Sequence, residues 1–472
     1  MVDTEDNRKN ANSPGPPPEE EVLDLKPEEE QVFLEVLLSG DKLRVRELIE
    51  ELHPADAADM LEHLSPDDRA MVVNILRDNF DPDLLAELDE TVRDHVVDVL
   101  GLEDLAAVIV ELDSDDALEV LEELDEGEQK QVLDAIPAGD RTLIEEGLSY
   151  PEDSAGRLMQ REVVTVPTFW NVGQTIDFLR HKTETEKAVM PGVFYDIFVV
   201  DPTHRPVGSI PLSRLLTTDR PVPVTDLMDA EMKVLPVSVD QEDVAFVFRQ
   251  RDLVSAPVVD DGGRLIGIIT IDDVVDVIHE EHEEDIMLLG GVKEDDLYEA
   301  SLYTMRARFS WLVVNLATAI LASVVIGLFD ATLQQMVALA ILMPIVASMG
   351  GNAGTQTLTV AVRALAMKEL TPANASRVIG KELLVGCFNG ILFAVLIGGV
   401  AWGWFGDPTL GVVIGLAMVV NMIVAGLAGT TIPLALDRFG IDPAVASGVF
   451  LTTITDVVGF FVFLGLAGLI MF

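Results

Sequence analysis

Five long apolar runs in the C-terminal third restrict the fold of this chain more than any other feature. They cover residues 309–328, 333–364, 383–405, 409–436 and 444–471. Each run reaches the length of about 20 residues that an α-helix needs to cross a hydrocarbon core. Because a bilayer offers no water to backbone amides, such runs fold as helices. The sequence therefore predicts an α-helical transmembrane domain with five helices over residues 309–472.

Charge separates this membrane part from the residues before it. Residues 309–472 carry seven acidic and five basic side chains, whereas residues 1–308 carry 74 acidic and 26 basic ones. A field this negative repels nucleic acid and attracts cations. The single cysteine, Cys387, lies inside an apolar run, which excludes an intrachain disulfide framework and a thiolate metal site. We therefore expect an acidic, intracellular soluble part without a nucleic-acid partner.

The soluble part begins with a tail and a helical repeat. Residues 1–30 are acidic and proline-rich and lack an apolar signal core, which predicts disorder. Residues 31–150 place a leucine or isoleucine at every twelfth position from Leu52 to Ile136. Twelve residues accommodate a short helix and a turn, so the repeat predicts an all-α superhelix. Such an array either binds something along its surface or serves only as a structural superhelix.

A second internal duplication follows, with strand-like alternation and a spacing of 69 residues. EVVTVP at 162–167 matches EMKVLP at 231–236, and each copy predicts a helix, two strands and a helix. The duplication resembles a tandem pair of CBS domains, an α/β regulatory module. The resemblance implies one domain over residues 151–220 and a second over residues 221–278.

CBS domains commonly hold a ribose with an Asp three residues after a Thr or Ser. The second copy has Thr270 and Asp273, whereas the first has Pro211 and Arg214 in the corresponding places. The resemblance therefore implies at most one nucleotide site, for ATP, at Thr270 and Asp273.

The last helix of the second copy continues as an acidic segment, and we expect one connecting helix over residues 272–293. Its carboxylates recur on successive turns with few bases beside them. Their repulsion destabilises the helix unless cations bridge them. Hard divalent ions such as Mg²⁺ prefer carboxylate oxygens, so we expect divalent cations to bind along this helix.

Basic residues predict how the spans are oriented. Arg306 and Arg308 precede the first run, four bases from Arg363 to Lys381 surround the second-to-third connection, and Arg438 follows the fourth run. The other two connections contain no base. By the positive-inside rule, the N-terminal part is cytoplasmic and the C-terminus is outside. We expect an integral protein of the plasma (inner) membrane.

Two of the runs contain polar residues that spans usually avoid. The GGNAG segment at 350–354 is tolerated at bilayer depth where it packs against protein or lines a wet cavity, and we expect it to free backbone carbonyls around Gly351. Asp456 has no basic residue at its depth to pair with, which marks it as functional. Carboxylate, hydroxyl and carbonyl oxygens suit hydrated Mg²⁺. The oxygen donors predicted to surround Asp456 come from Asn352, Thr355, Thr359 and Thr452.

In order and motif the chain resembles the MgtE family of bacterial Mg²⁺ channels. The resemblance rests on the acidic helical repeat, the paired CBS domains, the acidic connecting helix, and five spans with GGNAGTQ and DPAVASGVFLTTITDVVGF. It implies a homodimer with one pore on the dimer axis, lined by the second and fifth spans. The pore residues that it implies are Asp456, Gly351, Thr355, Thr359, Gly448 and Thr452.

The resemblance also implies regulation by cytosolic Mg²⁺, which holds the connecting helix over the pore as a plug. The sensing carboxylates that it implies in the CBS pair, the connecting helix and the inner loop are Asp240, Glu242, Asp252, Asp273, Asp276, Glu281, Glu284, Asp285 and Asp442. Those implied in the helical repeat are Asp83, Asp115 and Glu119. The expected function is Mg²⁺-selective influx that stops when cytosolic Mg²⁺ is high.

Other functions stay open at this point. A broader importer of Co²⁺, Mn²⁺ or Ni²⁺ uses similar oxygen ligands, and a CBS-regulated sensor needs no transport. A chloride channel requires bases or helix N-termini at depth, whereas the buried charge here is negative. All seven histidines precede the first span, and no HExxH motif occurs, which argues against an intramembrane metalloprotease. We expect no enzymatic activity.

Overall fold

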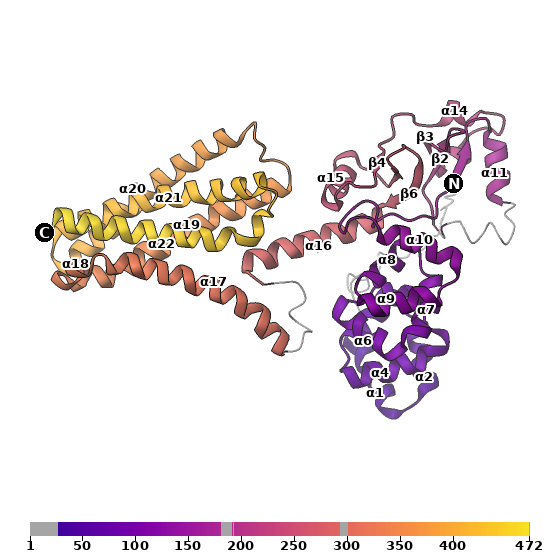
Figure 1. The fold of residues 1–472 in the computed structure, drawn as a ribbon, viewed down its shortest axis with the longest axis horizontal. Coiled ribbons are helices and arrows are strands. Elements are labelled where there is room, and N and C mark those ends of the chain that lie inside the picture. The colour runs from indigo at the N-terminus through magenta and orange to yellow at the C-terminus, as the bar shows by residue number, and fades with distance from the viewer. Residues whose placement is uncertain (1–26, 181–190, 192, 293–300, 472) are drawn as a thin grey trace, which may run out of the picture. The chain divides into compact units, whose positions relative to one another are not determined.

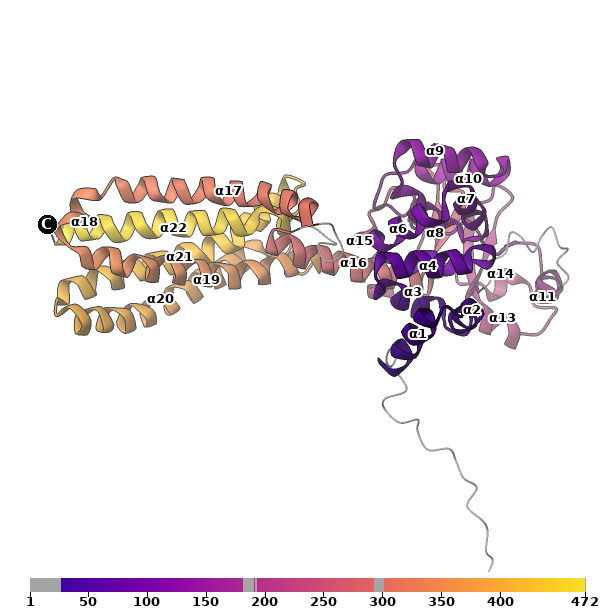
Figure 2. The ribbon, with the colours of Figure 1, turned by 90° about the horizontal axis from the view of Figure 1, so that it is seen from below.

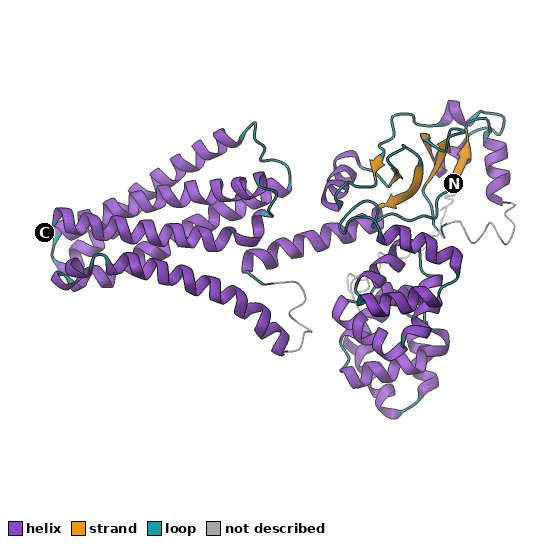
Figure 3. Cartoon of the chain, in the orientation of Figure 1, coloured by secondary structure: helices purple, strands orange, loops and turns teal. Residues whose placement is uncertain are grey.

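The computed structural model describes residues 27–180, 191, 193–292 and 301–471, so the predicted tail lies outside them up to residue 26. The chain divides into two compact units. The first holds the helical repeat and both small sheets, and the second holds residues 240–254 with 271–472. Figure 3 shows strands in one part of the chain only. A helical N-terminal part, two small mixed sheets and five long apolar helices confirm the predicted fold class.

Short helices build the first part of the first unit (Figure 1, indigo to purple). They are α1 (Pro27–Ser39), α2 (Lys42–Glu50), α3 (Pro54–Glu62), α4 (Pro66–Leu76), the 3₁₀ helix η2 (Arg77–Asn79), α5 (Pro82–Ala86), α6 (Glu90–Leu100), α7 (Leu102–Glu111), α8 (Ser114–Glu122), α9 (Glu126–Ala135) and α10 (Ala138–Leu148). Every helix from α7 to α10 begins twelve residues after the one before it. Most of the repeated leucines are buried, with Leu76 and Leu88 2 % and 1 % exposed, and Leu52 and Leu124 are partly buried against the same core. Each unit thus packs its apolar face on its neighbours, as the repeat predicts.

Two three-stranded sheets of the same topology follow. Their strands are β1 (Thr165–Pro167), β2 (Asp196–Val200), β3 (Pro206–Pro211), β4 (Leu235–Pro236), β5 (Ser255–Val259) and β6 (Leu265–Thr270). In each sheet the first strand pairs in parallel with the second, which pairs antiparallel with the third. The helices beside the sheets are α11 (Val172–Arg180), α13 (Leu212–Thr217) and α14 (Val224–Leu227). The equal order and register show the internal duplication directly.

The second unit joins two helices that follow the sheets to the five long apolar helices. Its elements are α15 (Gln241–Arg251), α16 (Ile271–Gly290), α17 (Ser301–Gly327), α18 (Asp330–Gln335), α19 (Val337–Ala366), α20 (Ala375–Phe405), α21 (Pro408–Arg438) and α22 (Pro443–Ile470). Five of these helices are long and apolar enough to cross a membrane. Helix α21 packs against α19, α20 and α22, and α17 packs against α22 (Figure 2). Helix α21 is therefore the most enclosed span.

Candidate functional site

The predicted pore carboxylate, Asp456, lies half-buried on α22. The Thr455 side chain is fully buried, and its Oγ1 donates to the Thr452 carbonyl at 3.0 Å. The Thr452 Oγ1 in turn donates to the Gly448 carbonyl at 3.0 Å. These hydroxyls use their protons within their own helix, which leaves their oxygens as electron-pair donors. Helix α22 thus carries an oxygen-rich stretch from Gly448 to Asp456.

The expectation that GGNAG frees backbone carbonyls around Gly351 is wrong. Helix α19 is unbroken from Val337 to Ala366, so these carbonyls belong to a regular helix. Gly350 and Gly354 serve close helix packing, as small residues do in membranes. A Cβ built on Gly350 would lie 2.2 Å from Asn421 Nδ2, whereas one on Gly351 would meet open space.

Helix α19 also carries a polar face formed by Asn352, Thr355 and Thr359. All three side chains are exposed in the single chain. The Thr359 Oγ1 donates to the Thr355 carbonyl at 3.0 Å, and Asn352 Nδ2 lies 3.4 Å from Ser348 Oγ. The structure thus places these three predicted ligands along one stretch of α19.

Asn421 of α21 links the two helices that carry the predicted filter, and it was missed from the sequence. Its side chain is fully buried, and Nδ2 donates to the Val346 carbonyl of α19 at 2.8 Å. A Cβ built on Gly459 of α22 would lie only 2.9 Å from the same nitrogen. Because Gly459 follows Asp456 by about one helical turn, Asn421 joins α19 and α22 one turn away from the carboxylate. The sequence feature that could have revealed it is a single amide side chain inside the apolar run at 409–436.

Carboxylates from three places form an acidic cluster, defined here as Asp240, Glu242, Glu281, Glu284, Asp285 and Asp442. The pKa of Glu281 is raised to about 7, mainly by burial and also by the charges of Glu242, Glu284 and Asp240, which together outweigh the lowering by a hydrogen bond from Gln241. Gln241 Nε2 donates to Glu281 Oε1 at 3.1 Å. A carboxyl group crowded by like charges gains when a cation arrives.

Two more members of the acidic cluster show the same effect. Burial raises the pKa of Glu242, with Lys368 opposing the shift and Asp285 and Asp442 adding to it. Burial and then the charge of Asp442 raise the pKa of Asp285, which His282 lowers. Asp442 therefore connects the inner loop before α22 to helices α15 and α16. Perturbed pKa values of this origin are typical of functional sites.

The acidic cluster is not a compact chelate. Among the residues that the structure describes, no three His, Cys, Asp or Glu side chains lie close enough to hold one ion. Mg²⁺ keeps several waters and needs only one or two carboxylates, so this spacing fits hydrated ions. Asp273 and Asp276 lie nearer the start of α16, and Asp252 ends α15 with a φ of 52°.

The other predicted sensing residues and one nucleotide residue belong to the first unit. Asp115 begins α8 and is 8 % exposed, and Asp83 lies in the first turn of α5. Glu119 accepts a hydrogen bond at 2.7 Å from Nη1 of the buried Arg93, which already neutralises one of the predicted ligands. Thr270 is 5 % exposed at the end of β6.

The C-terminal end of α16 packs against the membrane helices. Leu288 and Leu289 contact an apolar cluster of Leu358, Val362, Ala428, Ala444 and Leu451. A Cβ built on Gly448 would lie 4.0 Å from the Leu289 carbonyl oxygen. The end of α16 therefore reaches the oxygen-rich stretch of α22, where a plug would act.

A second contact anchors α15 to the connection between α19 and α20, and sequence reasoning missed it as well. Lys368 forms an ion pair with Asp243, and its ammonium lies 4.9 Å from the centre of the Phe246 ring. Arg249 Nη1 contacts Met367 Sδ at 2.7 Å. A loop lysine counted only for topology thus holds a cytosolic helix against the membrane domain.

Comparison with known proteins covers the same parts of the chain. Family models match residues 343–466 as MgtE, divalent cation transporter, residues 52–153 as the MgtE intracellular N domain, and residues 224–280 as a CBS domain. The magnesium transporter MgtE of Thermus thermophilus is 32 % identical over 443 residues, which cover 93 % of this chain and 97 % of that protein. The magnesium transporter MgtE of Bacillus subtilis is 30 % identical over 434 residues, covering 92 % and 95 %.

A solved structure, the cytosolic domain of the Mg²⁺ channel MgtE in complex with ATP, is 30 % identical with a TM-score of 0.48 and covers 52 % of this chain and 99 % of that one. The three matched regions follow one another in the order that the sequence predicts. The family is one of transporters rather than enzymes. The chain therefore belongs to the MgtE family of magnesium transporters, as a membrane protein with an intracellular N domain.

Proposed function

We propose that this chain is a Mg²⁺-selective channel for Mg²⁺ influx, with Asp456 as its pore carboxylate. The observation that carries the proposal is the position of Asp456 on α22, one turn from the packed Gly459–Asn421 contact. A carboxylate inside a span is costly and marks an ion pathway by default. Mg²⁺ dehydrates reluctantly, so one carboxylate with hydroxyl oxygens beside it can hold the hydrated ion without stripping it.

The exposed polar face of α19 supports a homodimer with one pore on its axis. Asn352, Thr355 and Thr359 are exposed in the single chain. Polar side chains facing lipid are unfavourable because hydrocarbon offers them no partner. A second copy across this face encloses them in a water-filled path, with the C-terminus of each chain outside the inner membrane.

The acidic cluster and the end of α16 support a gate that closes when cytosolic Mg²⁺ is high. Bound Mg²⁺ neutralises the repulsion between Glu242, Glu281, Asp285 and Asp442 and so favours the packed position of α16. Its loss restores the repulsion and releases Leu288 and Leu289 from the membrane helices. The remaining sensing residues are Asp252, Asp273, Asp276, Asp83, Asp115 and Glu119, and Thr270 with Asp273 forms a nucleotide site for ATP.

Transport into liposomes tests the pore. Wild-type protein should pass Mg²⁺ down its gradient, and Asp456→Ala should reduce the flux to that of protein-free liposomes. Asp437→Asn, which removes an exposed acid from the inner loop, is the matched control and should retain transport. Equal flux through Asp456→Ala and wild type would refute the pore assignment. Equal uptake of Co²⁺, Mn²⁺ or Ni²⁺ would favour a broader importer.

Neutralising the plug helix tests the gate. The triple change of Glu281, Glu284 and Asp285 to the corresponding amides should leave the channel open at high internal Mg²⁺. Inhibition by internal Mg²⁺ that stays the same as in wild type would exclude this part of the acidic cluster as the sensor.

A further inference from the structure

We propose a second cation site in the membrane domain, built around Glu382, that takes a hydrated divalent cation beside the pore. The inference rests on the proposed function, because the ion it receives is the transported one. Neither the sequence predictions nor the acidic cluster includes Glu382.

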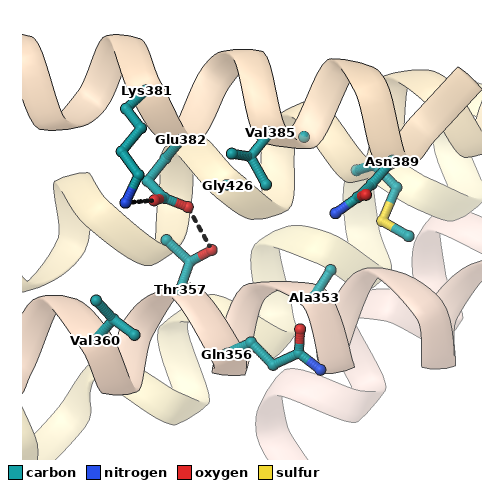
Figure 4. A pocket seen from close by; sticks show the side chains of 11 residues that line it. Ala353, Gln356, Thr357, Val360, Lys381, Glu382, Val385, Asn389 and Gly426 are labelled. Carbon is teal, nitrogen blue, oxygen red and sulfur yellow. Dashed lines mark hydrogen bonds and ion pairs between the residues drawn. The ribbon is translucent and has the colours of Figure 1, made fainter.

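A cavity of about 180 Å³ lies between α19, α20 and α21 (Figure 4). One water needs about 10–15 Å³ of such space, so the cavity admits the several waters that a bound Mg²⁺ keeps. The polar side chains that line the cavity are Gln356, Thr357, Lys381, Glu382 and Asn389. The cavity therefore has the size and the polarity that a hydrated ion requires.

Glu382 supplies the charge. It lies about 10 Å along α20 from Ala375, at 1.5 Å per residue, and its side chain is 13 % exposed. Its Oε2 accepts a hydrogen bond from Thr357 Oγ1 of α19 at 3.2 Å. A carboxylate at this position in a span is unfavourable unless a cation neutralises it.

Lys381 neutralises Glu382 only weakly in this geometry. Its Nζ lies 3.6 Å from Glu382 Oε1, and its side chain is 70 % exposed. This separation exceeds an ordinary N–H···O hydrogen bond, and exposed ion pairs of this kind contribute little. A lysine on a flexible stem can leave for solvent, so we infer that Lys381 holds the place that a divalent cation takes when it binds.

The far end of the cavity offers neutral acceptors for the waters of the ion. Gln356 on α19 and Asn389 on α20 line this end; Asn389 points from α20 into the space between the helices, and Gln356 lies along α19 (Figure 4). Their amide oxygens accept hydrogen bonds from water. The wall formed by α20 and α21 is tightly packed, because a Cβ built on Gly386 would lie 2.7 Å from the Met422 carbonyl oxygen. One carboxylate and two amides thus fit an ion held through its hydration shell.

The cavity and the polar face share helix α19. Gln356, which lines the cavity, directly follows Thr355 of the polar face, and consecutive residues of a helix point about 100° apart, so the cavity lies around the side of α19 from that face. Because α19 runs toward its cytosolic end at Ala366, Glu382 lies on the inner side of the membrane domain. A cation that has passed Asp456 can therefore pause at Glu382 before it enters the cytosol.

Counting bound ions tests this site directly on the full-length protein. Mn²⁺ serves as the probe because electron paramagnetic resonance distinguishes free from bound Mn²⁺. In an Asp456→Asn background, Glu382→Gln should bind one Mn²⁺ fewer per chain, and Lys381→Gln should bind Mn²⁺ at this site several-fold more tightly. Glu369→Gln, which removes an exposed acid from the α19–α20 connection, should leave the count unchanged.

Measuring Mg²⁺ flux distinguishes a cation site at Glu382 from an ion pair of Lys381 and Glu382 that is only structural. With Asp456 intact, Glu382→Gln should slow Mg²⁺ flux several-fold, and Glu382→Asp should restore part of it. An unchanged Mn²⁺ count in Glu382→Gln, or weaker Mn²⁺ binding in Lys381→Gln, would overturn the proposal. Wild-type liposomes that pass no Mg²⁺ would instead refute the proposed function, and the Mn²⁺ count would still decide whether this site exists.

Discussion

Acidification should weaken Mg²⁺ binding at the acidic cluster, and Glu281 should account for most of the effect. Its pKa is raised from 4.5 to about 7, mainly by burial. A divalent cation binds the ionised carboxylate, so protons and Mg²⁺ compete for the same group. The predicted perturbation is a change from pH 8 to pH 6, a range in which an ordinary glutamate stays ionised.

The size of the effect follows from the pKa. With a pKa of about 7, roughly 90 % of Glu281 is ionised at pH 8 and roughly 10 % at pH 6. The Mg²⁺ concentration at half-saturation should therefore rise about tenfold between these values. In the absence of Mg²⁺, acidification should have the opposite effect on the packing of α16. Since the packed state holds a proton that a separated Glu281 releases between pH 4.5 and about 7, lower pH should favour packing of α16.

Hydrogen exchange of residues 271–290 in the full-length protein measures both effects. Protection of α16 is titrated with Mg²⁺ at pH 6, 7 and 8, with exchange times corrected for intrinsic rates. Glu281→Gln should flatten the pH dependence of the midpoint. Glu283→Gln removes an exposed acid of the same helix and should retain the shift of the wild type.

The alternative explanation is that ionisable groups other than Glu281 control the pH dependence. A tenfold shift that persists in Glu281→Gln would assign the effect to those groups. It would also refute the argument that burial of Glu281 controls the proton competition.

Three further changes test other contacts. Gly459→Ala places a Cβ 2.9 Å from the Asn421 amide nitrogen, and this overpacking should cost about 1–3 kcal/mol. The displaced helices should also lower the preference for Mg²⁺ over Co²⁺ in liposome transport. An unchanged preference would contradict this prediction. Lys368→Gln breaks the half-exposed ion pair with Asp243. The free energy of local opening of α15, measured by hydrogen exchange, should therefore fall by no more than about 1 kcal/mol. A larger fall would show that contacts of Lys368 other than this ion pair stabilise α15. Arg93→Met removes the buried partner of Glu123 and two hydrogen bonds to the Leu88 carbonyl. The pKa of Glu123 is raised to about 8, mainly by burial, so its carboxyl group should be protonated in the variant, and the cost should be about 1–3 kcal/mol, that of an unsatisfied buried acceptor. Faster hydrogen exchange of α6 and α8 measures this loss, and unchanged exchange would contradict it.

Periodic features of the sequence predicted the fold well, because each reflects packing that repeats along the chain. The twelve-residue spacing corresponds to the starts of α6 to α10, and the 69-residue duplication corresponds to two sheets with one topology. The five apolar runs correspond to five long helices. The polar face of α19 and the position of Asp456 also followed from the residue types.

Contacts between distant segments were beyond this reasoning. GGNAG suggested a broken helix, yet Asn421 explains the glycine at 350, since a buried amide needs the space that a side chain would occupy. Glu382 was counted only for charge, because its partner Thr357 comes from another helix. Lys368 contributed to topology alone, and its contact with Asp243 spans more than a hundred residues of sequence. Such pairings depend on the packed arrangement and leave no local pattern.

The continuity of α16 makes it a lever. It runs without a break over 20 residues, or about 30 Å at 1.5 Å per residue. A rigid rod of that length turns a tilt of about 5° at one end into a displacement of about 3 Å at the other. Leu288 and Leu289 lie near the C-terminal end of α16 and pack against the membrane helices. A displacement of about 3 Å there is enough to break these apolar contacts. In the gate proposed above, a small tilt where α16 begins would thus be enough to separate Leu288 and Leu289 from the membrane helices without any change in the helix itself.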